Sequence, residues 1–64
     1  MVTKVKIRRT ELGLKQKDVA AMAGITPQYL MHIETGKAKN PSITVMKKLS
    51  KILNSTPNEL FFDD

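Results

Sequence analysis

The sequence predicts a compact, all-α domain built from five short helices, and three observations support this. Apolar residues recur three and four positions apart in five stretches, at 3–12, 16–23, 27–35, 43–53 and 57–62. Residues typical of helix ends (Gly, Asn, Ser, Thr and Pro) lie between these stretches. The chain of 64 residues allows a single domain over 1–64, and without cysteines its stability must come from helix packing or self-association.

Residues 16–35 are expected to form two helices joined by a tight turn. Gly24 tolerates a positive φ and so ends the first helix sharply. Thr26 is a good N-cap, and Pro27 suits the first helical position because its missing N–H costs nothing there. Ala20 is small enough for the second helix to cross close to the first. The pair is a candidate helix-turn-helix.

The outward side of the second helix is polar and carries no carboxylate. At 100° per residue, Gln28 and His32 point away from the inward Leu30. Such a surface suits the major-groove edges of DNA bases, where glutamine can bond adenine through N6 and N7. We therefore expect base contacts from Gln28 and His32, with Thr26, Pro27, Tyr29 and Met31 around them.

The net charge of +5 is unevenly distributed. Residues 1–51 contain all eleven Lys and Arg residues against three carboxylates, whereas residues 52–64 contain three carboxylates and no cation. A basic body suggests a polyanionic partner, although lysines that merely keep a small domain soluble explain the charge equally well.

A longer series of residues resembles the Cro/phage-repressor (XRE-like) helix-turn-helix family from Val5 to Phe61. The residues that carry the resemblance are Arg9, Gly13, Leu14, Gln16, Ala20, Gly24, Leu30, Ile33, Glu34, Gly36, Pro41 and Ser42. The resemblance implies a lambda-repressor-like DNA-binding domain that binds double-stranded DNA sequence-specifically. It further implies a transcriptional regulator, and we expect a repressor.

The resemblance also implies roles for individual residues. Arg9 and Glu34 both occupy inward positions, where an unpaired charge would be costly, and the family uses such a pair to tie its first and third helices. Gln16 corresponds to the family's phosphate-contacting residue. Phosphate contacts are also expected from Lys15 and from the loop residues Lys37, Lys39 and Asn40, since lysine–phosphate contacts release counterions. The chain departs from the family pattern at Arg8, Lys15 and Ser55.

The C-terminal part contains more apolar residues than its helices can bury. Ser42 caps the fourth helix, Asn54 can close it in a left-handed conformation, and Thr56 begins a capping box. Leu60, Phe61 and Phe62 cannot all face inward. They can wrap back onto the first helix or form a two-fold dimer patch, which we favour, and a homodimer implies a palindromic operator. The expected patch residues are Ile43, Ile52, Phe61 and Phe62.

Other functions are less well supported by the sequence. The N-terminus lacks a signal-peptide pattern, and the longest charge-free run, 19–33, is too short to cross a bilayer, so a cytoplasmic protein is expected. With a single histidine and no cysteine, we expect no metal site and no enzyme. No cofactor or small-molecule ligand is evident. The main alternative is a protein-binding or antitoxin-like adaptor that works through the C-terminal apolar patch; the others are non-specific DNA coating and catalysis by His32.

Overall fold

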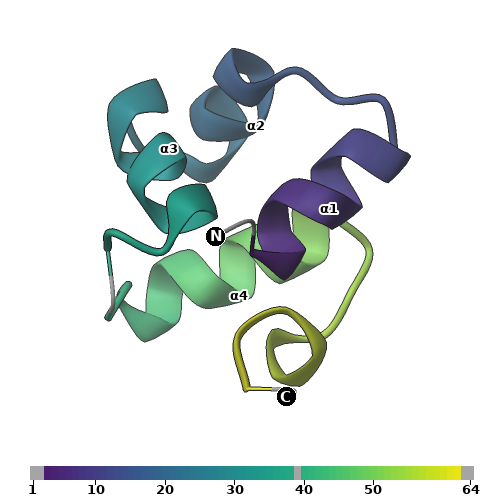
Figure 1. The fold of residues 1–64 in the computed structure, drawn as a ribbon, viewed down its shortest axis with the longest axis vertical. Helices are drawn as coiled ribbons and strands as arrows, with labels where there is room; N and C mark the ends of the chain where they lie inside the picture. Colours follow the sequence, from purple (N-terminus) through teal and green to yellow (C-terminus); the bar gives the residue numbers. More distant parts are fainter. Residues whose placement is uncertain (1–2, 39, 63–64) are drawn as a thin grey trace.

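The computed structural model describes residues 3–38 and 40–62, and within them the chain is helical with no strand. Its elements are α1 (Lys4–Glu11), α2 (Gln16–Ala23), α3 (Pro27–Thr35), α4 (Ile43–Ile52) and the short π-helical η1 (Asn58–Phe62). Figure 1 shows α2 and α3 side by side, α4 running beneath them, and η1 beside α1 at the opposite end. The predicted all-α fold is confirmed.

One hydrophobic core joins all five elements. Its buried side chains come from α1 (Val5), α2 (Val19, Ala20, Ala23), α3 (Leu30, Ile33), α4 with its C-cap (Leu49, Leu53) and η1 (Leu60). The absence of a side chain beyond Cβ at Ala20 lets α2 and α3 pack closely. Because each helix contributes only one narrow apolar face, the outer faces of α3 and α4 remain available to solvent.

The helix ends follow from local chemistry. Thr26 Oγ1 accepts a hydrogen bond from the amide of Tyr29 (3.0 Å), and Ser42 Oγ accepts one from Val45 (3.2 Å), so both predicted N-caps are confirmed. Gly24 and Asn54 adopt the predicted left-handed conformation, with φ of 70° and 52°. These two residue types tolerate that conformation best.

The capping box before η1 is also confirmed. Thr56 Oγ1 accepts a hydrogen bond from the amide of Glu59 (3.1 Å), and Glu59 Oε1 accepts one from the amide of Thr56 (3.1 Å). Leu60 then points into the core, Phe61 is half-buried, and Phe62 is 62% exposed. The C-terminal segment therefore packs on α1, one of the two arrangements considered above, and leaves the aromatic ring of Phe62 in solvent.

The first helix differs from the sequence expectation at both ends. It ends at Glu11, so Leu12 stands outside it and is 40% exposed instead of facing inward. Thr3 occupies the N-cap position but makes no capping hydrogen bond through its side chain; its amide instead donates to the carbonyl of Glu34 (3.0 Å). That bond attaches the start of α1 to the end of α3.

Arg8 has a structural role that the sequence did not indicate. Its Nε donates to the carbonyl of Leu53 (2.9 Å) and its Nη2 to that of Asn54 (3.5 Å), while Nη1 lies 3.5 Å from Glu11. The last carbonyls of a helix lack partners within the helix and carry partial negative charge. A cation from α1 therefore caps the C-terminal end of α4.

Arg8→Ala is expected to lower the free energy of unfolding by about 1 kcal/mol, since it removes the hydrogen bond to the α4 terminus from a partly exposed site. Urea denaturation followed by circular dichroism measures the change. Lys6→Ala, at an exposed position of the same helix, is the matched control and should change stability by no more than about 0.5 kcal/mol. Equal effects of the two substitutions would contradict the capping role.

Two further findings bear on function. Within residues 3–38 and 40–62, no helix has the length and hydropathy needed to cross a membrane. The same part of the chain brings together no group of three or more His, Cys, Asp or Glu side chains that could hold a metal ion.

Candidate nucleic-acid interface

The outer face of α3, defined here as Gln28, Met31, His32 and Thr35, is turned away from the core residues Leu30, Ile33 and Glu34. Gln28 and Thr35 are exposed, Met31 is 42% exposed, and His32 is half-buried. The face carries no acidic side chain, because the single carboxylate of the helix is buried on the opposite side. It offers an amide, an imidazole, a thioether and a hydroxyl to a neighbouring molecule.

The flanks of this face differ from one another. Thr26 and Pro27 are exposed at the start of the helix, and the Thr26 hydroxyl is already engaged as the N-cap. Tyr29 is half-buried and packs against the hydrophobic core, so less of its ring reaches solvent than the sequence suggested. The structure therefore brings all six expected base-contacting residues onto or beside one helix, with Gln28 and Met31 the best exposed of the larger side chains.

A buried ion pair holds α3 against α1. The guanidinium of Arg9 donates from Nε to Glu34 Oε2 (2.6 Å) and from Nη2 to Glu34 Oε1 (3.1 Å). Arg9 also donates from Nη1 to the carbonyl of Leu14 (2.8 Å), in the segment between α1 and α2. Because Glu34 is only 1% exposed, this two-bond contact is what satisfies its charge. It fixes the orientation of α3 relative to the rest of the domain.

Gln16 extends this cluster to the start of α2. Its Nε2 donates to Glu34 Oε1 (3.1 Å), a contact that the sequence did not indicate. One amide proton and the amide oxygen of Gln16 have no further hydrogen bond among the described residues. Lys15 stands at the N-cap of α2, is exposed, and provides no capping hydrogen bond. The N-terminal amides of α2 therefore receive no capping hydrogen bond from the Lys15 side chain, and the first turn holds one carboxylate, Asp18. Uncapped amides at a helix N-terminus favour an anion.

The loop after α3 adds positive charge beside the same face. Gly36 ends the helix, and the amide of Ala38 donates to the carbonyl of His32 (2.9 Å), which ties the loop to the end of α3. Lys37 and Asn40 are exposed. Lys39, the remaining loop residue expected to contact phosphate, lies outside the described residues.

The four residues expected to form a dimer patch do not lie together. Phe61 and Phe62 line a shallow hollow with Met46, and Ile43, 66% exposed, lies one turn from Met46 on α4. Ile52 instead lines a groove with Met22, Lys48 and Lys51. Nine residues are two and a half turns of helix, so Ile43 and Ile52 point to opposite sides. The C-terminal apolar surface is defined here as Ile43, Met46, Phe61 and Phe62. Ile52 lies apart from it.

Comparison with known proteins points to one family. A family model described as "Helix-turn-helix" matches residues 5–60. An uncharacterized HTH-type transcriptional regulator of Archaeoglobus fulgidus is 31% identical over 65 residues, which cover 100% of this chain and 91% of that protein. Some relatives are longer: the chain spans 51% of the HTH-type transcriptional regulator SinR from Bacillus subtilis, with 33% identity over 57 residues.

Solved structures of SinR have the same arrangement of helices. The N-terminal DNA-binding domain of SinR from Bacillus subtilis matches with a TM-score of 0.84 and 31% identity, covering 95% of this chain and 87% of that one. A crystal structure of SinR in complex with DNA matches with a TM-score of 0.79 and 33% identity, covering 86% and 87% of the two chains.

Proposed function

Since this chain belongs to the helix-turn-helix family and is a DNA-binding transcriptional regulator, we propose that it binds a specific duplex with the outer face of α3 in the major groove and acts as a repressor. The observation that carries the proposal is the exposure of a polar face without carboxylates on a helix fixed by buried contacts. Binding to chromosomal DNA would take place in the cytoplasm. We propose no catalytic step for this chain, and His32 instead contacts a DNA base.

Gln28 and His32 are the proposed base readers. Gln28 has the amide donor and acceptor that match adenine N7 and N6, and its exposed side chain is free of packing constraints. His32 lies one turn further along and reaches the groove edge from a half-buried position. Met31 and Pro27 supply apolar surface for a thymine methyl group, while Thr26 and Tyr29 lie at the rim.

Phosphate contacts orient the domain in this proposal. Gln16 uses its remaining amide proton on a phosphate while its other proton stays on Glu34, which links the backbone contact to the position of α3. Lys15 and the α2 N-terminus, with Lys37, Lys39 and Asn40 on the other side of α3, complete the contacts. Such contacts determine register on the duplex and add affinity without sequence preference.

Lys37→Ala is expected to weaken binding to all duplexes alike and to reduce the slope of log K against log salt by about 1, the contribution of one neutralised phosphate. Fluorescence anisotropy at several salt concentrations, on a selected and on a random duplex, measures both effects. Lys47→Ala is the matched control, because Lys47 is exposed on α4 among the solvated lysines and should leave the slope unchanged. If Lys47→Ala reduces the salt slope more than Lys37→Ala does, the phosphates lie against α4 and not against the loop after α3.

A two-fold dimer would place two α3 helices in successive major grooves, about 34 Å apart, on a palindromic operator. The apolar surface of Ile43, Met46, Phe61 and Phe62 supports this part of the proposal, since exposed apolar patches commonly mark protein contacts. Phe62→Ser is therefore expected to shift the monomer–dimer equilibrium toward monomer in sedimentation equilibrium, with folding unchanged. Ile52→Ser, outside this surface, should have the smaller effect; the reverse order would exclude this interface.

The same apolar surface is the observation that favours the alternative, a protein-binding adaptor. One solved relative is a SinR–SinI protein complex, with a TM-score of 0.85 and 32% identity. Salt distinguishes the two functions, because phosphate binding weakens steeply between low and moderate salt whereas an apolar protein contact hardly responds. Selection of bound duplexes from a random pool tests the main proposal: enrichment of a palindromic sequence supports it, and uniform recovery would indicate non-specific coating.

A further inference from the structure

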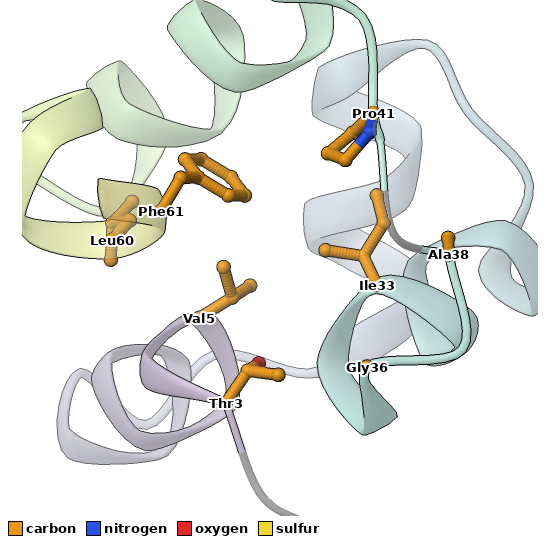
Figure 2. Close-up of a pocket in the computed structure, with 8 residues that line it drawn as sticks. All are labelled: Thr3, Val5, Ile33, Gly36, Ala38, Pro41, Leu60 and Phe61. Atoms are coloured by element: carbon orange, nitrogen blue, oxygen red, sulfur yellow. The ribbon is translucent and has the colours of Figure 1, made fainter. Parts of the chain in front are cut away.

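The helix proposed to enter the major groove contains no lysine and no arginine. It runs from Pro27 to Thr35, and its single carboxylate, Glu34, is buried in the ion pair with α1. Figure 2 shows the inward side of this helix, where Ile33 points into the same apolar space as Val5 and Phe61. The outer face of α3, turned away from that space, therefore meets a duplex without a lysine, an arginine or a carboxylate.

This composition does not match the major-groove edge of a G·C pair. Guanine presents two acceptors, N7 and O6, which proteins bind most often with arginine or lysine, and the N4 donor of cytosine is bound by a carboxylate. The nearest lysines along the chain are Lys17, in the first turn of α2, and Lys37, in the loop beyond Gly36. Both lie outside α3, so a guanine beneath the middle of the helix would have no partner of this kind.

Two adjacent strips along α3 match an A·T pair instead. Gln28 and His32, four residues apart, form a polar strip. Pro27 and Met31, also four residues apart, form an apolar strip beside it. The Gln28 side chain is exposed and makes no hydrogen bond to a described residue, so its amide is available for adenine N7 and N6. Pro27 is exposed and Met31 is 42% exposed, which leaves apolar surface for the 5-methyl group of thymine.

We propose that the half-site beneath α3 has a centre of adjacent A·T pairs, with an adenine bound by Gln28 and a thymine methyl group packed on Met31 and Pro27. This inference rests on the proposed function and adds the class of sequence that the domain selects. An A·T pair presents both an adenine edge for an amide and a methyl group for an apolar side chain, whereas a G·C pair presents no methyl group. His32 does not distinguish the two kinds of pair, because a neutral imidazole has one donor and one acceptor and can serve either.

The shape of the minor groove is a second source of preference for A·T pairs, and inosine separates the two sources. An I·C pair presents the major-groove edge of a G·C pair, but it lacks the N2 amino group and so presents the minor-groove edge of an A·T pair. If α3 sets the preference in the major groove, I·C pairs bind as weakly as G·C pairs. If the narrow minor groove sets it, I·C pairs bind as tightly as A·T pairs.

The test uses the full chain and the duplex enriched from a random pool. Each A·T pair at the half-site centre is replaced in turn by A·U, G·C or I·C, and fluorescence anisotropy at fixed salt measures the affinity. We expect G·C and I·C to weaken binding by about tenfold or more at the Gln28 position, the usual effect of a mismatched pair. The A·U pair removes only a 5-methyl group, and at the Met31 position it should weaken binding about three- to fivefold.

Methionine variants assign the methyl contact to one side chain. Met31→Ala should bind the A·T and A·U duplexes equally, and Met31→Leu should keep the difference between them. Met22→Ala is the matched control, because it removes a methionine that is 56% exposed on α2, away from the outer face of α3. It should distinguish A·T from A·U as the unchanged chain does.

Three results would overturn the proposal while leaving specific DNA binding intact. They are enrichment of a half-site with G·C pairs at its centre, I·C pairs that bind as tightly as A·T pairs, and a difference between A·T and A·U that persists in Met31→Ala. Recovery of duplexes without any sequence preference would instead contradict the proposed function itself, and the A·T assignment with it.

Discussion

Replacing Arg9 with methionine is expected to lower the free energy of unfolding by about 3–5 kcal/mol, the usual cost of leaving a buried charge without its partner. Glu34 is 1% exposed and loses both guanidinium bonds in this variant, and only the amide of Gln16 remains on its carboxylate. A domain of this size has a total stability of only about 3–10 kcal/mol. The variant is therefore expected to be largely unfolded at 37 °C, as measured by thermal melting and urea denaturation.

Two companion variants make this prediction specific to the ion pair. Glu34→Gln removes the charge while keeping most of the hydrogen-bonding atoms, and it should cost less than Arg9→Met. The double variant Arg9→Met with Glu34→Met should be more stable than Arg9→Met alone, because a pair of apolar side chains can replace a buried ion pair at little cost. Measured beside the single variant Glu34→Met, additive effects in the double variant would show that Arg9 and Glu34 do not depend on one another.

The variant Gln28→Ala is expected to weaken binding to the selected duplex by about 1–3 kcal/mol and to relax base preference at one position in each half-site. The reason is that a bidentate amide–adenine contact would be lost while every phosphate contact stays. Competition between the selected duplex and duplexes changed at single base pairs, measured at fixed salt, gives the loss of affinity and the change in base preference. Stability should change little, since Gln28 is exposed and makes no hydrogen bond to another described residue.

Asn58→Ala is the matched control, because it removes an exposed amide from η1, away from α3. It should leave affinity and base preference as they are. If Gln28→Ala behaves in the same way, the docking register proposed for α3 is wrong. If it instead weakens all duplexes equally, Gln28 contacts the backbone and another residue reads the base.

The parts of the fold that could be predicted are those governed by neighbouring residues. A threonine or serine before a helix accepts an amide proton a turn later, and a glycine or asparagine after it takes a left-handed conformation; Thr26, Ser42, Gly24 and Asn54 all do so. The inward positions of Arg9 and Glu34 followed from helical periodicity, and their pairing followed because two opposite buried charges need one another.

The features that could not be predicted depend on contacts between distant segments. Arg8 caps a helix whose end is 45 residues away, and Gln16 reaches a carboxylate on another helix. Neither contact leaves a periodic signal. The separation of Ile52 from the other patch residues could have been found from the sequence, because nine positions along a helix reverse the direction of a side chain.

Backbone amide shifts during titration with a selected duplex report whether the outer face of α3 enters the major groove. We predict that the largest changes fall on residues 26–35, on the N-terminal turn of α2 and on Lys37, with little change along the exposed lysines of α4. If the largest changes instead fall on Lys47, Lys48 and Lys51 and the α3 signals do not move, α4 and not α3 faces the duplex.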